Sequence, residues 1–253
     1  ATPLRAQTAK IGKYYGHKLG TVADPIQYSC QQNFVMLVTD GYWNESEPLT
    51  ASVTGSDVAN QDNVLGTGTG QAPRPYYDGA QASTTCPGSG TRSSASSCRT
   101  LSDIAWYYYS TDLRSTTFSN KCNAGLGNTC ADGSANDVSI NNVLTTADDK
   151  NQAQHMNFYA MGLGIDGTLD YRSDYLTAGV GDFAQLRAGT KNWPAVANLD
   201  PTAVDDLWHA TANGRGKYFS ARNVPNVIAG LREALNKIGA RVGSAAAAAT
   251  SNL

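Results

Sequence analysis

The sequence predicts an α/β fold with a mainly parallel sheet flanked by helices. Helical and strand-like segments alternate along the 253 residues, beginning and ending with a helix, as is typical of this class. The strand-like segments are continuous apolar runs without alternation, as expected for strands covered on both faces. The first run, residues 34–38, stops abruptly at Thr39-Asp40-Gly41. A carboxylate at the end of such a strand lies where open α/β sheets bind ligands, although Asp40 could also simply begin a turn.

Composition limits the classes of partner. The chain has 19 Lys and Arg against 21 Asp and Glu, a net charge of −2, which argues against nucleic acid or an anionic membrane as the main partner. No apolar run approaches the roughly 20 residues of a membrane span. Charged residues make up only 16% of the chain, and four cysteines lie in polar segments rich in Gly, Ser and Thr. These features indicate an exported protein.

The first half of the chain contains two predicted helices around the first strand. A helix is expected over residues 2–19, with Thr2 as its N-cap and Pro3 at its first position. The second helix follows Thr100, which forms a capping box with Asp103. The aromatic residues 106–109 on this helix are interpreted as core packing, with a ligand-stacking surface as the alternative.

The second half contributes two strands and two helices. A buried strand is expected between His155 and Asp166, and its final glycines predict a turn that requires glycine. A helix should run from Asp200-Pro201 to about residue 213, followed by a strand over residues 217–220. Asn223 should cap a last amphipathic helix that continues past residue 238. Two motif matches here are weak: residues 162–167 fit G-x-G-x-x-G without a following helix, and residues 166–169 resemble part of a haloacid dehalogenase signature whose nucleophile position is glycine here.

Two long polar segments are interpreted as insertions, over about residues 42–99 and 114–154. We expect one domain over residues 1–243 and a helix end or linker over 244–253. The acidic residues of the second insertion, which could bind calcium, do not fit a calcium loop and are interpreted as solvated turn residues; they are Asp132, Asp137, Asp148 and Asp149.

Four cysteines within the insertions are predicted to form disulfides; they are Cys86, Cys98, Cys122 and Cys130. The sequence leaves all three possible pairings open. A zinc site is the alternative, but there is no C-x-x-C spacing and no histidine nearby. Cys30 remains, either as a buried thiol or with a partner elsewhere.

Several blocks of the sequence resemble a known family. Thr2-Pro3-Leu4 at a helix start, the T-D-G strand end, and the strand ending in Gly162-Leu163-Gly164 are similar to the von Willebrand factor A fold. The blocks CQQNFVMLVTDGYWN, LSDIAWYYYSTDLR and DDLWHATANGRGKYFSA resemble the N-terminal A domain of PilY-type proteins, which are tip-associated adhesins and assembly factors of type IV pili in Gram-negative bacteria. The resemblance spans most of the chain.

The resemblance implies a metal-ion-dependent adhesion site, or MIDAS, that holds Mg²⁺, Mn²⁺ or Ca²⁺. Thr2 and Asp40 match two of its three parts, but no D-x-S-x-S follows a strand in this sequence. The nearest match is residues 137–141, in the second insertion. We therefore expect the first strand of the fold to be absent, which leaves the strand at 34–38 as an exposed apolar edge. Two oxygen ligands alone are too few for tight metal binding.

The resemblance further implies a non-catalytic binding module that supports pilus assembly, surface attachment and twitching motility. Expected partners are minor pilins at the pilus tip, a host or abiotic surface ligand, and the rest of its own polypeptide. The expected location is the periplasm and the cell surface at the pilus tip. One alternative is a hydrolase- or phosphatase-like enzyme using Asp40 or Asp166, although G-x-S-x-G, D-x-D and a metal-type histidine cluster are absent. Another is a purely structural module that docks on minor pilins.

Overall fold

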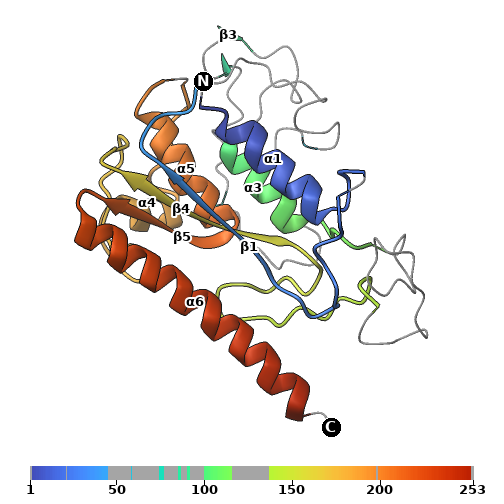
Figure 1. The fold of residues 1–253 in the computed structure, drawn as a ribbon. Coiled ribbons are helices and arrows are strands. Elements are labelled where there is room, and N and C mark those ends of the chain that lie inside the picture. Colours follow the sequence, from blue (N-terminus) through green and yellow to red (C-terminus); the bar gives the residue numbers. More distant parts are fainter. Residues whose placement is uncertain are drawn as a thin grey trace.

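The computed structural model describes residues 2–20, 22–44, 58, 74–76, 85–86, 90–91, 100–115, 137–197 and 199–251. For residues 85–86, 90–91 and 243–251, the description is limited to the backbone. The predicted strands and helices form an α/β unit in which a sheet separates two layers of helices (Figure 1). In the described part of the chain, no helix is both long and apolar enough to span a membrane.

Three parallel strands form the main sheet, and each follows an apolar run of the sequence. They are β1 (Asn33–Thr39), β4 (Met156–Leu163) and β5 (Arg215–Ala221), in the order β1-β4-β5. Val35 of β1 lies opposite Phe158 of β4. Two short strands, β2 (Thr85–Cys86) and β3 (Gly90–Thr91), pair antiparallel in a separate sheet. The predicted α/β class is confirmed, and a von Willebrand factor A-like fold is consistent with this arrangement.

Helices cover the two faces of the sheet unequally. One face carries α3 (Leu101–Ser110) and α5 (Thr202–Asn213), with α1 (Leu4–Tyr15) beside α3 (Figure 1). The long helix α6 (Val224–Ser251) lies on the opposite face. A short helix, α4 (Asp182–Ala188), interrupts a segment for which the sequence predicted only a connection. The division between a domain and a tail at residue 243 stays a prediction, and the α6 backbone continues to Ser251.

The helix starts test the predicted caps. The Thr100–Asp103 capping box is present in both directions, as predicted. Asn223 accepts a hydrogen bond from the backbone of Asn226 over 3.0 Å, also as predicted. The expected cap by Thr2 is wrong, because α1 begins at Leu4 and Pro3 occupies the N-cap position without a side-chain hydrogen bond. The carbonyl of Thr2 accepts the Leu4 N–H instead, so Thr2 stands one residue too early to cap the helix.

The core between the sheet and the α3–α5 layer is built largely from aromatic side chains. Trp208 stacks on Phe183 with the ring centroids 5.7 Å apart and an angle of 13°. Tyr171, Tyr175, Trp193 and Tyr218 pack around this pair. The packing interpretation of residues 106–109 is also confirmed, since only Tyr107 among them is not buried. Aromatic rings bury a large area and prefer particular mutual orientations, so their contacts account for much of the packing in this layer.

The two apolar strands differ in burial. β4 is the central strand and is buried along nearly its whole length, as an uninterrupted apolar run predicts. For β1 that prediction is wrong: Val35 is buried, but Met36 and Leu37 are half-buried and Val38 is 48% exposed. The reason is its place in the sheet, because β1 pairs only with β4 among the described residues. The expectation that this strand forms an exposed apolar edge is confirmed.

Parts of the predicted insertions belong to the core. Trp43 and Val58 are buried, although residues 42–99 were expected to lie outside it. Val138 and Val143 in the second insertion are buried as well. Asp137 and Asp149 are only 2% and 4% exposed, so their interpretation as solvated turn residues is wrong, whereas Asp148 is exposed as expected and Asp132 lies outside the described residues. A polar segment can enter the core where its hydrogen bonds are satisfied, and composition alone does not reveal this.

Candidate functional site at the carboxyl edge of the sheet

The T-D-G loop directly follows β1 and presents Asp40 to solvent. Thr39 is buried, and its hydroxyl donates to the Gly41 carbonyl over 2.9 Å and accepts the Gly41 N–H over 3.2 Å. These two bonds fold the loop back on the strand end. Asp40 is exposed. The loop therefore holds a carboxylate at the carboxyl edge of the sheet, where ligands of open α/β sheets bind.

The start of α1 is attached to the same loop. The backbone N–H of Thr2 donates to the side-chain oxygen of Asn44, four residues after Asp40. Arg5, in the first turn of α1, is buried, and its guanidinium lies 4.0 Å from the centre of the Trp43 ring. This cation–π contact and the hydrogen bond fix the N-terminus of α1 against the loop. The structure thus brings Thr2 and the Asp40 loop to one edge, through partners that no sequence motif indicated.

The end of β4 adds a tight turn and an acidic side chain. Gly164 has a φ of +68°, so the predicted glycine requirement is confirmed. Asp166 follows and forms an ion pair with Arg222, which lies after β5. Both side chains are exposed. Asp166 is therefore a surface residue held beside the ends of β4 and β5.

A polar cavity of about 350 Å³ opens beside this ion pair. Asp205 lies in its wall and accepts hydrogen bonds from the backbone of Thr168 and Leu169 and from the Thr168 hydroxyl. Burial raises the pKa of Asp205 above its usual value, and these hydrogen bonds offset only part of that rise. The buried Tyr218 hydroxyl also lines the cavity and has no hydrogen-bond partner among the described residues. The edge thus combines carboxylates and hydroxyls, which suit polar ligands.

Among the described residues, no group of three or more His, Cys, Asp and Glu side chains could hold a metal ion. Thr2 and Asp40 by themselves supply too few oxygen ligands for a divalent cation, which usually takes at least six. Asp137, in the segment closest to D-x-S-x-S, accepts hydrogen bonds from the backbone and the hydroxyl of Ser139 and stabilises a turn. The described residues therefore do not form a complete metal site.

The histidines occupy structural positions. His155 is buried, and its Nε2 lies 3.0 Å from an Asp149 carboxylate oxygen. His209 is buried and stacks on Trp193 with the ring centroids 4.4 Å apart. His17 lies 3.7 Å from Asp24, which also pairs with the buried Arg114 over 2.5 Å. The histidines are spread over the molecule and do not converge on Asp40 or Asp166.

The four cysteines of the predicted disulfides lie outside the part of the chain that the structure describes with side chains. The structure describes only the backbone of Cys86, and Cys98, Cys122 and Cys130 are outside the described residues. The pairing of these four cysteines stays a prediction. Cys30, the fifth, is half-buried and has a free thiol.

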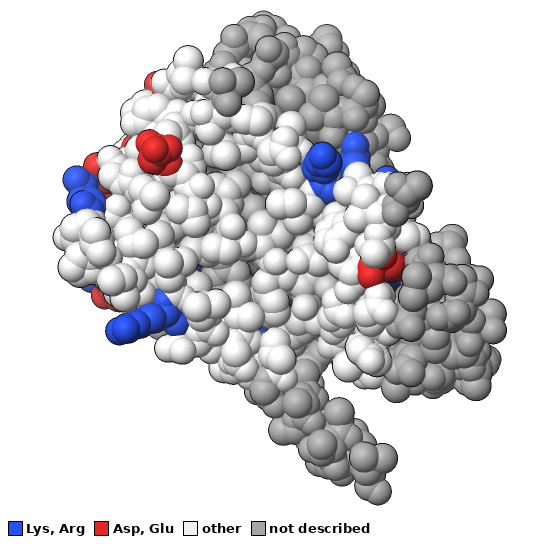
Figure 2. Space-filling view, viewed as in Figure 1, with Lys and Arg blue, Asp and Glu red and all other residues white. Residues whose placement is uncertain are grey.

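The visible surface carries few charges. On the face seen in Figure 1, charged side chains are separated by large uncharged areas (Figure 2). This agrees with the net charge of −2 and with the charged fraction of 16%. No extended basic patch is present on that face outside the grey atoms, as a surface for nucleic acid would require.

Comparisons with known proteins identify relatives that match nearly the whole chain. No protein-family model matches it, and no solved structure does. The type IV pilus biogenesis factor PilY1 of Pseudomonas aeruginosa strain UCBPP-PA14 is 30% identical over 245 residues, which are 95% of this chain and 19% of PilY1. PilY1 of strain PAK is 30% identical over 246 residues, 94% of this chain. The chain spans about a fifth of the length of these relatives. It is therefore a homologue of one segment of the type IV pilus biogenesis factor PilY1.

Proposed function

We propose that this chain is a non-catalytic binding module that serves in type IV pilus biogenesis. The similarity to PilY1 extends over 95% of the chain, which supports a shared role for the segment. The histidine contacts support binding over catalysis, because the three histidines contact Asp149, Trp193 and Asp24, and histidine is the commonest partner in acid–base chemistry. The module acts outside the cytoplasm, in the periplasm and at the pilus tip on the cell surface.

One observation carries the choice of binding surface: β1 is an edge strand with an exposed apolar side chain. An unpaired strand edge offers a row of backbone donors and acceptors to another strand. Val38 is 48% exposed near the end of β1, one residue before the T-D-G loop. We propose that a further strand of the longer polypeptide pairs with this edge. Pairing would cover Val38 and bring additional side chains next to Asp40.

We further propose that a divalent cation binds at this completed edge. Asp40 and Thr2 would contribute a carboxylate and a hydroxyl oxygen, and the added segment would contribute the remaining oxygen ligands. Mg²⁺ is the cation expected first, with Mn²⁺ and Ca²⁺ as the alternatives, since all three take oxygen ligands. A bound cation with an open coordination position attracts an acidic group of a partner. Minor pilins and a host or abiotic surface ligand are the proposed partners.

The experiment that tests this function places Asp40→Ala in the full-length protein in its native host. Piliation, attachment to a surface and twitching are then measured against the unchanged protein. Attachment should fall while the amount of protein stays the same, because Asp40 is exposed and its removal leaves the fold intact. Unchanged attachment with normal piliation would leave only a structural docking role. Restoration by Asp40→Glu, which retains a carboxylate, would separate the charge from the local shape.

A further inference from the structure

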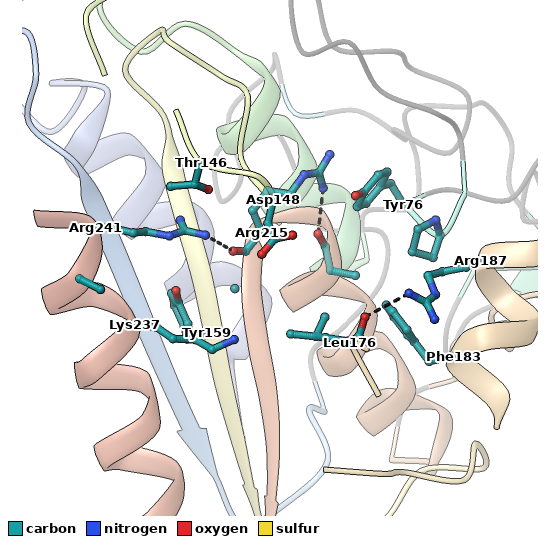
Figure 3. A pocket seen from close by; sticks show the side chains of 14 residues that line it. Tyr76, Thr146, Asp148, Tyr159, Leu176, Phe183, Arg187, Arg215, Lys237 and Arg241 are labelled. Atoms are coloured by element: carbon teal, nitrogen blue, oxygen red, sulfur yellow. Dashed lines mark hydrogen bonds between the residues drawn. The ribbon is translucent and has the colours of Figure 1, made fainter. Parts of the chain in front are cut away.

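A second cavity lies at the other edge of the sheet, beside β5, and its charge is of the opposite sign. It has a volume of about 340 Å³ and lies between α6, α4 and the start of β5 (Figure 3). Four cationic side chains line it: Arg187, Arg215, Lys237 and Arg241. Among the described residues of its wall, only Asp148 is acidic, and it is exposed. Such an excess of positive charge around a concave site raises the local concentration of anions.

Arg215 is fixed at the back of this cavity. Its guanidinium lies 3.4 Å from the centre of the Tyr76 ring and 4.4 Å from that of Tyr109. It also donates to the carbonyls of Ala212 and Asn213 over 2.8 and 3.0 Å. The backbone of Arg215 has a φ of +56°, a conformation that residues other than glycine rarely adopt. Strain of this kind persists only where the surroundings impose it, and it is concentrated at functional sites.

The two cations of α6 stand one turn apart and face the same space. Arg241 donates to the Arg215 carbonyl over 3.0 Å and lies 3.4 Å from an oxygen of Asp149. Lys237 is half-buried, and its ammonium is 3.9 Å from the nearest oxygen of Glu233, which pairs more closely with Lys217 over 2.6 Å. Burial lowers the pKa of Lys237, and the positive charge of Lys217 lowers it further. Lys237 is thus a cation with only a loose ion pair, held in a positive environment.

The remaining wall is apolar and is supplied from three elements. Two aromatic rings come from Tyr159 of β4 and Phe183 of α4, and an aliphatic side chain comes from Leu176 in the segment before α4. In Figure 3, Arg187 extends along Phe183, where its two terminal nitrogens donate to the carbonyls of Leu176 and Ala178. A ligand for this cavity needs a charged end for the cations and an apolar part for these side chains.

We propose that the cavity beside β5 binds an organic anion in which a phosphate or carboxylate is joined to an apolar group. The anionic end lies between Lys237 and Arg241, with the fixed charge of Arg215 behind it, and the apolar group packs against Phe183 and Leu176. Charge-assisted hydrogen bonds from Lys and Arg are the strong contacts that such a group requires. This site is separate from the carboxyl edge and does not depend on the function proposed there.

Phenyl phosphate is the test ligand, and its binding to the 253-residue chain is measured by calorimetry at low ionic strength. Inorganic phosphate and benzyl alcohol carry the anionic and the apolar part separately. Phenyl phosphate should bind more tightly than either, and its affinity should fall as salt is added. Equal affinity for inorganic phosphate would overturn the role of the apolar wall, and no binding of phenyl phosphate would overturn the site.

Variants then locate the binding. Lys237→Met should lower the affinity at least about tenfold, the size expected for one lost hydrogen bond to a charged group. Lys10→Met, which removes the same charge from an exposed position on α1, is the matched control and should bind normally. Ala240→Glu adds a carboxylate to the cavity wall at an exposed helical position and should lower the affinity by a similar factor or more. If Lys237→Met and Lys10→Met bind alike while both remain folded by circular dichroism, the assignment is wrong.

Discussion

The two edges of the sheet differ in how their charged residues are held. At the β1 edge, Asp40 is exposed on a short loop that is held by Thr39 and attached to the start of α1. At the β5 edge, Arg215 and Asp149 are buried and contact several aromatic and polar side chains. An exposed charge such as that of Asp40 lowers the stability of the fold little and is available to a partner. A buried charge such as that of Arg215 or Asp149 is part of the packing, so its removal should lower the free energy of unfolding of the domain.

The largest expected difference is between two aspartates. Asp149 accepts hydrogen bonds from Tyr109 and Asn157, and it pairs with His155 and Arg241. Removing one partner of a buried charged network leaves the others unsatisfied and costs about 3–5 kcal/mol. Asp149→Ala should therefore lower the free energy of unfolding in urea by about that amount. Asp40→Ala, the matched change at the other edge, should alter it by less than about 0.5 kcal/mol. Equal losses would contradict the contrast between the edges.

The second prediction concerns acid sensitivity on the β5 side. His209 is buried, and this burial lowers its pKa to about 3. A hydrogen bond with the Tyr76 carbonyl raises the pKa and offsets only part of that effect. A histidine whose folded pKa lies below its unfolded value of about 6.5 loses stabilisation as the pH falls below 6.5, because the unfolded chain binds the proton first.

Between pH 6 and pH 4 the free energy of unfolding should thus fall by up to about 1.4 kcal/mol per pH unit through this residue. His209→Gln keeps a donor for Tyr76 and does not titrate, so its pH profile should be flatter over the same range. Urea unfolding of both proteins at several pH values gives the comparison. If the free energy of unfolding changes with pH in the same way in both proteins, the folded pKa of His209 is not lowered by burial.

The third and smallest contrast lies within β1. Val35 is 7% exposed and packs in the core, whereas Val38 is 48% exposed. Val35→Ala should cost about 1.5–2.5 kcal/mol, from two buried methyl groups and the space that they leave. Val38→Ala should cost less than about 0.5 kcal/mol. A similar cost at both positions would mean that the open side of β1 is covered in solution, for example by self-association, which sedimentation would detect.

The strands and most helix ends could be predicted because their signals are local. The run at 34–38, the buried strand that ends just before Gly164, and the caps at Thr100 and Asn223 each lie within a few neighbouring residues. The position of Asp40 at the end of β1 was predictable for the same reason, since this carboxylate directly follows the apolar run. The exposed edge of β1 was also predictable, because no D-x-S-x-S follows a strand in these 253 residues.

The β5 cavity could not be predicted, because its wall comes from residues far apart in the sequence. Tyr76, Asp148, Arg187, Arg215 and Lys237 belong to five separate segments. The left-handed backbone of Arg215 has no sequence signal, since this conformation usually indicates glycine or asparagine. Asp149 was misjudged as solvated because two of its side-chain partners, Tyr109 and Arg241, lie 40 residues before it and 92 after it. The Arg5–Trp43 contact escaped notice for the same reason.

We propose above that the β1 edge with Asp40 becomes a metal-dependent binding site once a further strand pairs with it. The most direct measurement is calorimetric titration of Mg²⁺, Mn²⁺ and Ca²⁺ into this chain and into a polypeptide extended at its N-terminus to include the strand proposed to pair with β1. We expect binding in the extended polypeptide, loss of that binding in its Asp40→Ala variant, and no tight binding in the 253-residue chain if the proposed site is correct. Absence of binding in both polypeptides, or binding that survives Asp40→Ala, would contradict it.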